Sequence, residues 1–250
     1  MQTEESPVYA PEELKGLDPR LVPSHVAIIM DGNRRWARRH SLAPIMGHWK
    51  GADALTNIVT AAKSLGIKVL TVFSFSTENW SRPEDEVEGL MHLFKNYLLQ
   101  QKVAMIEEGI KLDAIGDLSG LPAEVRDTVE ECKRATAHCD QIELVLAMNY
   151  GGRNDILQAA RALAKDAAEG KLQDMEISEQ VFSGYLDTAK WEDPELLIRT
   201  SGENRISNFL LWQLSYAEVY ISDVLWPDFS EGNLLDAVIE YQKRGRRWGT

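Results

Sequence analysis

The chain has 250 residues, of which 39 are acidic and 27 are basic, so its formal net charge is −12. This balance argues against a protein that binds nucleic acid over a broad basic surface. The hydrophobic fraction is 44%, which is typical of a globular protein, and no run of about 18 apolar residues predicts a membrane-spanning helix. The two cysteines form no metal-binding or disulfide pattern, and residues 1–23 read as neither a signal nor a transit peptide. We therefore expect a cytoplasmic protein.

The predicted elements alternate between strands and helices along the chain. Residues 1–23 are acidic and contain prolines, which predicts a flexible arm before one catalytic domain over residues 24–250. Apolar and β-branched runs predict strands over residues 25–30, 69–75, 111–116, 142–148, 195–200 and 219–222. Apolar residues at helical spacing predict helices over residues 51–65, 81–108, 122–137, 153–168, 178–187 and 234–245. This order predicts an α/β fold: a doubly wound, open, mostly parallel six-stranded sheet flanked by helices.

Polar segments follow four of the predicted strands, at residues 31–36, 76–82, 149–153 and 199–207. The carboxyl ends of parallel strands meet at one edge of a sheet, which is where ligands bind. The four segments combine a carboxylate, several arginines and backbone amides, which are the groups that hold phosphate and Mg²⁺. Residues 25–50 also hold five basic residues against one acid, a local charge of +4. A basic island on an acidic protein favours a small polyanion as ligand.

Each feature has a simpler explanation when it is taken alone. An isolated Asp-Gly pair such as Asp31-Gly32 is most often a turn. A single tryptophan or histidine, such as Trp80 or His48, is more often packed or solvated than bound to a ligand. Basic runs are often solvated helix faces. The chain has neither a GxGxxG nor a GxxxxGK[ST] pattern, so dinucleotide and Walker-type nucleotide binding are not supported. Four such segments at one predicted edge favour a shared site.

Six segments, in the same order along the chain, resemble the cis-prenyltransferases, and most closely the bacterial undecaprenyl diphosphate synthases. They are HVAIIMDGNRRWA (25–37), GH (47–48), FSTENWSRPEDEV (75–87), NYGGR (149–153), IRTSGENRISNFLLWQLSYAE (198–218) and DVLWPDF (223–229). The resemblance extends from residue 25 to about residue 249. The DDxxD motif of the unrelated trans-prenyltransferases is absent, since the sequence contains no Asp-Asp pair.

The resemblance implies a transferase that condenses isopentenyl diphosphate repeatedly onto an allylic diphosphate, usually farnesyl diphosphate, with cis double bonds. The implied product is a long polyprenyl diphosphate such as undecaprenyl diphosphate, a lipid carrier precursor for cell-wall synthesis. The resemblance also implies Mg²⁺ as cofactor, a homodimer, a hydrophobic tunnel between the sheet and two helices, and membrane contact only through the lipid product. Three alternatives are a shorter-chain cis-prenyl diphosphate synthase, a Mg²⁺-dependent phosphoesterase and a non-catalytic subunit that binds diphosphate lipids.

The resemblance also implies roles for individual residues of this sequence, according to their positions in the quoted motifs. The resemblance implies that Asp31 and Asn79 are catalytic and that Asp31 and Glu218 bind the metal. Because a neutral amide is very weakly basic, we expect Asn79 to orient a pyrophosphate oxygen that accepts the proton. The implied substrate-binding residues are Gly32, Asn33, Arg34, Arg35, Trp36, His48, Ser76, Thr77, Glu78, Trp80, Arg82, Arg199, Arg205, Ile206 and Ser207. Arg199, Arg205 and Ser207 would hold isopentenyl diphosphate, whereas Arg35 would hold the allylic diphosphate.

Two positions depart from the common pattern of the family. Arg34 stands where many bacterial members have glycine, and Pro44 stands where the family often has an arginine. The basic ending with Arg247 and Gly249 resembles an Arg-x-Gly tail that members pass across the dimer interface. We also expect the apolar run 209–214 and the last helix to offer interface surfaces.

Overall fold

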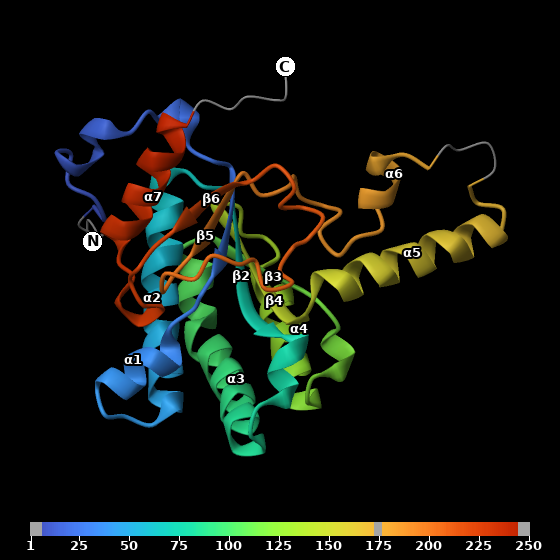
Figure 1. Ribbon diagram of the computed structural model, residues 1–250, viewed down its shortest axis with the longest axis horizontal. Coiled ribbons are helices and arrows are strands. Elements are labelled where there is room, and N and C mark those ends of the chain that lie inside the picture. The colour runs from blue at the N-terminus through green and yellow to red at the C-terminus, as the bar shows by residue number, and fades with distance from the viewer. Residues whose placement is uncertain (1–6, 173–176, 245–250) are drawn as a thin grey trace.

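The computed structural model describes residues 7–172 and 177–244 (Figure 1). Its strands are β1 (His25–Ile29), β2 (Val69–Ser76), β3 (Ile110–Ile115), β4 (Ile142–Tyr150), β5 (Leu196–Arg199) and β6 (Glu218–Ile221). They form one sheet in the order β3-β4-β2-β1-β5-β6, and every neighbouring pair is parallel. The predicted six-stranded parallel sheet is confirmed.

The helices are α1 (Asn33–Arg39), α2 (Pro44–Leu65), α3 (Glu84–Glu107), α4 (Ala123–Thr136), α5 (Gly152–Ala168), α6 (Glu179–Ser183) and α7 (Glu231–Lys243). Helix α2 begins seven residues before the predicted start, because Pro44 occupies its first turn, where a missing N–H costs nothing. Residues Thr77–Ser81 form a 3₁₀ turn, and α3 starts only after Pro83.

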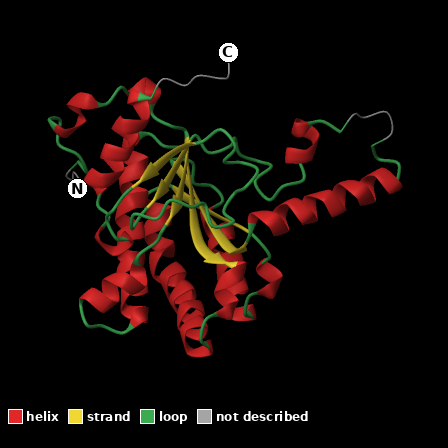
Figure 2. Cartoon of the chain, viewed as in Figure 1, coloured by secondary structure: helices red, strands yellow, loops and turns green. Residues whose placement is uncertain are grey.

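The helices gather mainly on one face of the sheet, which differs from the doubly wound arrangement that we expected. Residues of α2, α3, α4 and α7 form one core with the strands, including Ile58, Leu98 and Ile28. The opposite face packs against Phe209 and Leu210 from the loops between β5 and β6 (Figure 2). Both side chains are fully buried, so this part of the apolar run that we expected at an interface belongs to the core.

Helix α5 leaves the body of the molecule (Figure 1). Only its Gly152, Asp155 and Ala159 are buried, all in the first half of the helix. The N-terminal arm, in contrast, packs onto α7 over its described residues. Tyr9 is buried and donates to the Glu231 carbonyl oxygen at 3.0 Å, and Gln242 bonds both backbone groups of Asp18. No helix in residues 7–172 and 177–244 is long and apolar enough to cross a membrane.

Candidate active site

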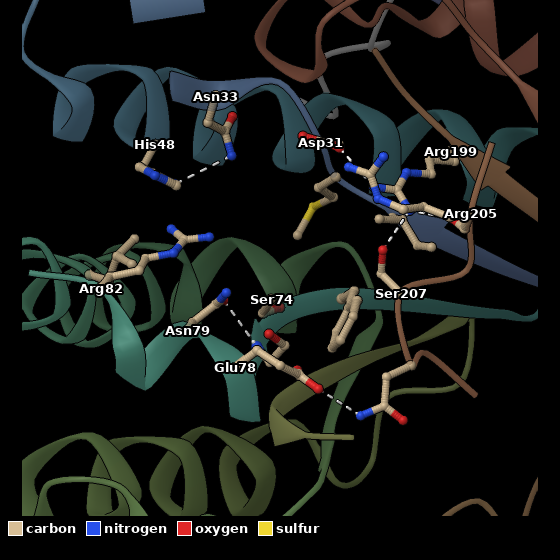
Figure 3. A pocket seen from close by; sticks show the side chains of 16 residues that line it. Asp31, Asn33, His48, Ser74, Glu78, Asn79, Arg82, Arg199, Arg205 and Ser207 are labelled. Atoms are coloured by element: carbon tan, nitrogen blue, oxygen red, sulfur yellow. Dashed lines mark hydrogen bonds and ion pairs between the residues drawn. The ribbon is translucent and has the colours of Figure 1, made fainter. Parts of the chain in front are cut away.

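Two polar cavities adjoin at the carboxyl ends of β1, β2 and β5. The central cavity, with a volume of about 620 Å³, is drawn in Figure 3. The arginine cavity has a volume of about 930 Å³. Residues that line both are Met30, Asp31, Asn33, His48, Arg82 and Arg205. Three of the four predicted polar segments, residues 31–36, 76–82 and 199–207, therefore meet at one edge of the sheet, whereas no residue of 149–153 lines either cavity.

Asp31 lies at the junction of the two cavities, two residues after the end of β1. Its Oδ2 accepts from Arg199 Nη2 at 2.9 Å, and its Oδ1 lies 3.4 Å from Arg35 Nη2. Burial raises the pKa of Asp31, but the two guanidinium groups outweigh burial and hold that pKa below its ordinary value. Asp31 is therefore an anion that faces two polar spaces.

Arg199 fixes the loop that follows β5. The guanidinium is 3% exposed and donates to Ser207 Oγ at 2.8 Å and to the Arg205 carbonyl oxygen. This loop holds non-glycine residues with positive φ at residues 201, 207, 208 and 210. Left-handed backbone of this kind persists only where the surroundings hold it in place, and it concentrates at functional sites. Buried Arg199 supplies part of that support.

Arg35 connects α1 to the same loop. It donates to the Ser201 carbonyl oxygen at 3.1 Å and lies 3.2 Å from Glu203. Arg35 lines the arginine cavity together with Arg34 and Arg38. Arg82 also lines this cavity; it donates to Glu86 at 3.0 Å, and Glu86 lies 3.8 Å from Arg34. The arginine cavity is therefore strongly cationic despite the acidic character of the whole chain.

Asn33, on α1, and His48, on α2, lie side by side where these two helices meet, and both line the two polar cavities. Asn33 Nδ2 lies 3.3 Å from His48 Nδ1, while His48 Nε2 and Asn33 Oδ1 are buried and have no hydrogen-bond partner among the described residues. Burial, together with Arg82 and Arg34, lowers the pKa of His48 to about 4. The helices approach this closely because residue 47 is glycine: a Cβ there would overlap the Asn33 carbonyl oxygen. A neutral imidazole with an unpaired nitrogen is available to a ligand.

The turn after β2 presents Asn79 to the central cavity. Asn79 Oδ1 accepts from the Ser76 backbone N–H at 3.1 Å, so its amide nitrogen is the group it can offer to a ligand. The neighbouring Glu78 accepts from Asn208 Nδ2 at 2.9 Å. Burial raises the pKa of Glu78, but the bond from Asn208 and other local donors bring it below the ordinary value.

An apolar cavity continues from these polar cavities into the protein. Its volume is about 60 Å³, and it lies between the sheet and helices α2 and α3. Residues that line both this cavity and the central cavity are Met30, Asn33, His48, Ser74 and Leu90. Its other walls are Gly51, Ala52, Leu55, Leu93, Phe94, Tyr97, Leu98, Leu146 and Trp226. This cavity lies between the sheet and two helices, where the family resemblance implies a hydrophobic tunnel.

Comparison with known proteins gives the family. A family model described as "Putative undecaprenyl diphosphate synthase" matches residues 29–249. The chain belongs to the undecaprenyl diphosphate synthase family. It is 48% identical to an isoprenyl transferase of Prochlorococcus marinus subsp. pastoris over 233 residues, 93% of this chain and 86% of that protein.

Two further relatives support the family. The farnesyl-diphosphate-specific ditrans,polycis-undecaprenyl-diphosphate synthase of Pasteurella multocida is 48% identical over 93% of this chain and 97% of its own. The crystal structure of lavandulyl diphosphate synthase from Lavandula x intermedia, in complex with dimethylallyl diphosphate, matches with a TM-score of 0.90 and 37% identity. That match covers 92% of this chain and 100% of the lavandulyl enzyme. The structure thus has the fold of a cis-prenyltransferase.

Most of the residues that the family motifs predicted do line the two polar cavities. They are Asp31, Gly32, Asn33, Arg34, Arg35, His48, Ser76, Glu78, Asn79, Arg82, Arg199, Arg205 and Ser207. Four others do not line these cavities: Trp36, Thr77, Trp80 and Ile206. Trp36 donates to Asp228 Oδ1 at 2.7 Å, and Trp80 donates to Asn149 Oδ1 at 2.8 Å. In this structure the two indoles support neighbouring segments and do not contact either cavity.

Glu218 is placed differently from the prediction. It begins β6 and pairs in register with Leu196 at the start of β5, whereas Asp31 follows the end of β1. Glu218 is thus level with Val26, three residues before the end of β1 and five before Asp31, and the three strand residues alone span about 10 Å at 3.3 Å per residue. The Glu218 carboxylate accepts from Arg244 at 3.1 Å. Within one chain the two carboxylates therefore lie apart, and their joint binding of a metal ion stays a prediction. The predicted tail residues Arg247 and Gly249 lie outside the described residues.

Sequence reasoning overlooked Asn208 and Ser74. Asn208 lines the central cavity, donates to Glu78, and accepts from the Arg153 backbone N–H at 2.9 Å, so it joins three loops. It follows Ser207 inside a quoted motif, and that position could have indicated it. Ser74 lines the junction with the apolar cavity. It lies inside a strand that reads as apolar, so no local signal indicates it.

Proposed function

We propose that this chain condenses isopentenyl diphosphate repeatedly onto an allylic diphosphate, with farnesyl diphosphate as the starter, and forms cis double bonds. The observation that carries the proposal is the junction of the central cavity, which adjoins the cationic arginine cavity, with the apolar cavity through five shared residues. A prenyl diphosphate has a polar head and a hydrocarbon tail that need these two environments side by side. A phosphoesterase would need only the cationic part.

The reaction requires two diphosphates near each other. The C1–O bond of the allylic diphosphate breaks, a carbon–carbon bond forms to isopentenyl diphosphate, and one proton and pyrophosphate leave. Arg34, Arg35 and Arg38 surround the arginine cavity and suit the leaving diphosphate, whose negative charge grows as the bond breaks. Arg205 and Ser207 line the central cavity and suit the diphosphate of isopentenyl diphosphate.

Asp31 fits a Mg²⁺ ion together with substrate oxygens. The described residues contain no group of three or more side chains that could hold a metal by themselves. Mg²⁺ commonly takes one or two carboxylates and completes its shell with phosphate oxygens and water, so one ionised carboxylate beside a diphosphate cavity suffices. When bound, the ion would neutralise charge on the leaving diphosphate. Arg199 and Arg35, which now neutralise Asp31, hold that carboxylate in place.

The role that we propose for Asn79 is to orient the proton acceptor. Because its amide oxygen is held by Ser76, the nitrogen donates, and a pyrophosphate oxygen is the acceptor that such a donor would position. This role requires no basic amide. The neutral His48, with its unpaired Nε2, adds a second polar contact at the entrance of the apolar cavity.

We further propose a homodimer, with membrane contact limited to the lipid product. Two features of the described chain support a second copy. Strand β6 is an edge of the sheet with Val219 42% exposed, and the projecting α5 carries Leu157 at 47% exposure. Deletion of residues 246–250, with oligomeric state and kinetics measured together, tests whether the tail acts in assembly or at the site.

Transfer of labelled isopentenyl diphosphate tests the function. The purified chain is incubated with farnesyl diphosphate, labelled isopentenyl diphosphate and Mg²⁺, and butanol-extractable label is counted. We expect extractable label that depends on both substrates and is lost with EDTA. Release of phosphate from farnesyl diphosphate without incorporation of label would favour the phosphoesterase. Binding without either reaction would favour the non-catalytic subunit.

A further inference from the structure

Asn208 follows Arg205 and Ser207 in the loop between β5 and β6, which we propose holds isopentenyl diphosphate. Both groups of its side-chain amide have partners on other loops. The oxygen Oδ1 accepts from the Arg153 backbone N–H at 2.9 Å, and Nδ2 donates to Glu78 Oε1 at 2.9 Å, the bond drawn from Glu78 in Figure 3. Since a backbone N–H can only donate, it fixes the oxygen toward Arg153 and the nitrogen toward Glu78. Asn208 is thus held in one orientation between two other loops.

The backbone of Asn208 supports the same arrangement. Its φ is 62°, in the left-handed region, which asparagine tolerates better than most residues. Its carbonyl oxygen accepts from the Gly152 backbone N–H at 2.7 Å, in the turn between β4 and α5. Residue 151 must be small for this approach, because a Cβ at Gly151 would lie 2.7 Å from Asn208 Nδ2 and 2.8 Å from Thr77 Oγ1. The turn after β4 therefore fits closely against both Asn208 and the turn after β2.

Glu78 lies in the 3₁₀ turn that presents Asn79 to the central cavity. Two side chains of this turn bond to neighbouring segments. Trp80 donates to Asn149 Oδ1 at 2.8 Å, near the end of β4. Glu78 accepts from Asn208, in the loop after β5. The bond between Glu78 and Asn208 therefore links the turn of Asn79 directly to the loop after β5, while Trp80 holds the same turn to the sheet.

The proposed reaction makes the distance between these two segments important. The new carbon–carbon bond forms at the terminal alkene carbon of isopentenyl diphosphate. A proton then leaves the carbon next to the one that carries the diphosphate, and its electron pair becomes the new double bond. The loop after β5 holds the diphosphate, and Asn79 orients the oxygen that takes the proton. A displacement of about 1 Å between such groups can cost about a hundredfold in rate.

We propose that Asn208 is a positioning residue for this proton removal: through Glu78, it fixes the distance between Asn79 and the loop that holds isopentenyl diphosphate. This inference rests on the proposed prenyl transfer. A change at Asn208 should slow the condensation without weakening the allylic diphosphate, because the arginines that suit that diphosphate lie on α1.

Reversal of the hydrogen bond tests this role. Asn208→Gly removes both side-chain bonds and tolerates the positive φ. Asn208→Asp keeps an acceptor for Arg153 but turns a second carboxylate toward Glu78. Glu78→Gln combined with Asn208→Asp restores one donor and one acceptor, with the polarity reversed and the summed charge of the pair unchanged. Asn57→Asp, at an exposed position on α2, is the matched control for the added charge.

The measurements are the single-turnover rate of the first condensation, both Michaelis constants and the melting temperature. We expect Asn208→Gly and Asn208→Asp to lose about tenfold to a hundredfold in rate, with an unchanged KM for farnesyl diphosphate. The double variant should regain about tenfold relative to Asn208→Asp, and Asn57→Asp should match the wild type. A merely structural bond would lower the melting temperature and leave the rate of the folded enzyme unchanged, and that result would overturn the inference.

The remaining outcomes separate this inference from the proposed function. Wild-type rates in both single variants of Asn208 would overturn its role and leave the transferase intact. A double variant that stays as slow as Asn208→Asp would overturn the bond to Glu78 as the positioning contact. If Asn208→Gly does not fold, Asn208→Asp and the double variant carry the same test. No elongation by the wild-type chain would overturn the proposed function and this inference with it.

Discussion

The Asp31 carboxylate and the Arg199 guanidinium lie 2.9 Å apart, although 168 residues separate them in the sequence. Arg199 is buried, and its Nη1 donates to Ser207 Oγ and to the Arg205 carbonyl oxygen. One side chain thus sets the position of the carboxylate after β1 relative to the loop after β5. The two diphosphate-binding regions that we propose are therefore built around a common ion pair.

Replacement of Asp31 tests this arrangement. We expect Asp31→Ala to reduce turnover at saturating Mg²⁺ by about 10³-fold or more, because loss of a transition-state metal ligand removes several kcal/mol. Asp31→Asn keeps the shape of the side chain and can still accept from Arg199, so its thermal stability should stay near that of the wild type while its turnover falls equally. Steady-state kinetics and thermal melting of both variants provide the check. A tenth of wild-type turnover in Asp31→Ala would contradict the assignment.

The two cationic regions should serve different substrates. We expect Arg35→Ala to raise chiefly the KM for the allylic diphosphate and Arg205→Ala to raise chiefly the KM for isopentenyl diphosphate. Each lost charge-assisted contact should cost roughly 1.5–3 kcal/mol, or about tenfold to a hundredfold. The measurement is both Michaelis constants for both variants. Equal effects on the two substrates would show that the regions do not act separately.

Stability should fall in acid because of a buried histidine. His25 is 2% exposed, with its ring nitrogens bonded to Thr71 Oγ1 and the Glu192 carbonyl oxygen. Burial lowers its pKa from 6.5 to about 4, so the unfolded chain binds more protons than the folded chain between these values. The free energy of unfolding should therefore decrease by about 3 kcal/mol as the pH falls from 6.5 to 4.

Urea unfolding at several pH values checks this expectation. His25→Gln should flatten the pH dependence between pH 4 and 6.5, whatever its effect on stability at neutral pH. His138→Gln, at an exposed position, is the matched control and should leave the dependence unchanged. A wild-type dependence that persists in His25→Gln would assign the acid sensitivity to other groups.

The contact between α1 and α2 depends on a glycine. A Cβ at Gly47 would overlap the backbone carbonyl of Asn33, which cannot move as a flexible side chain could. Gly47→Ala should reduce the free energy of unfolding by about 1–3 kcal/mol and weaken allylic substrate binding, because Asn33 and His48 would shift apart. Gly232→Ala, where the nearest atom to a Cβ is Ser230 Oγ at 3.7 Å, should be neutral or stabilising. Equal stability of the two variants would show that the helices can separate without cost.

The sequence predicted the strands and the polar edge well because these depend on local pattern. Short apolar runs define β1, β2 and β4, and parallel pairing then brings their carboxyl ends together. Other features depend on contacts between residues that are far apart in the sequence. Nothing local shows that Phe209 lies in the core, that Trp36 turns to Asp228, or that Glu218 lies at the other end of its strand. Motif resemblance names such residues, but only the register of β5 and β6 places Glu218 relative to Asp31.

Product stoichiometry tests the central claim most directly. Unlabelled farnesyl diphosphate and excess isopentenyl diphosphate are incubated with the protein and Mg²⁺, and the prenyl products are measured by mass spectrometry together with released pyrophosphate. The account predicts a series of polyprenyl diphosphates that differ by one isoprenyl unit, with one pyrophosphate released per unit added. Orthophosphate or pyrophosphate released without any product longer than farnesyl would contradict it.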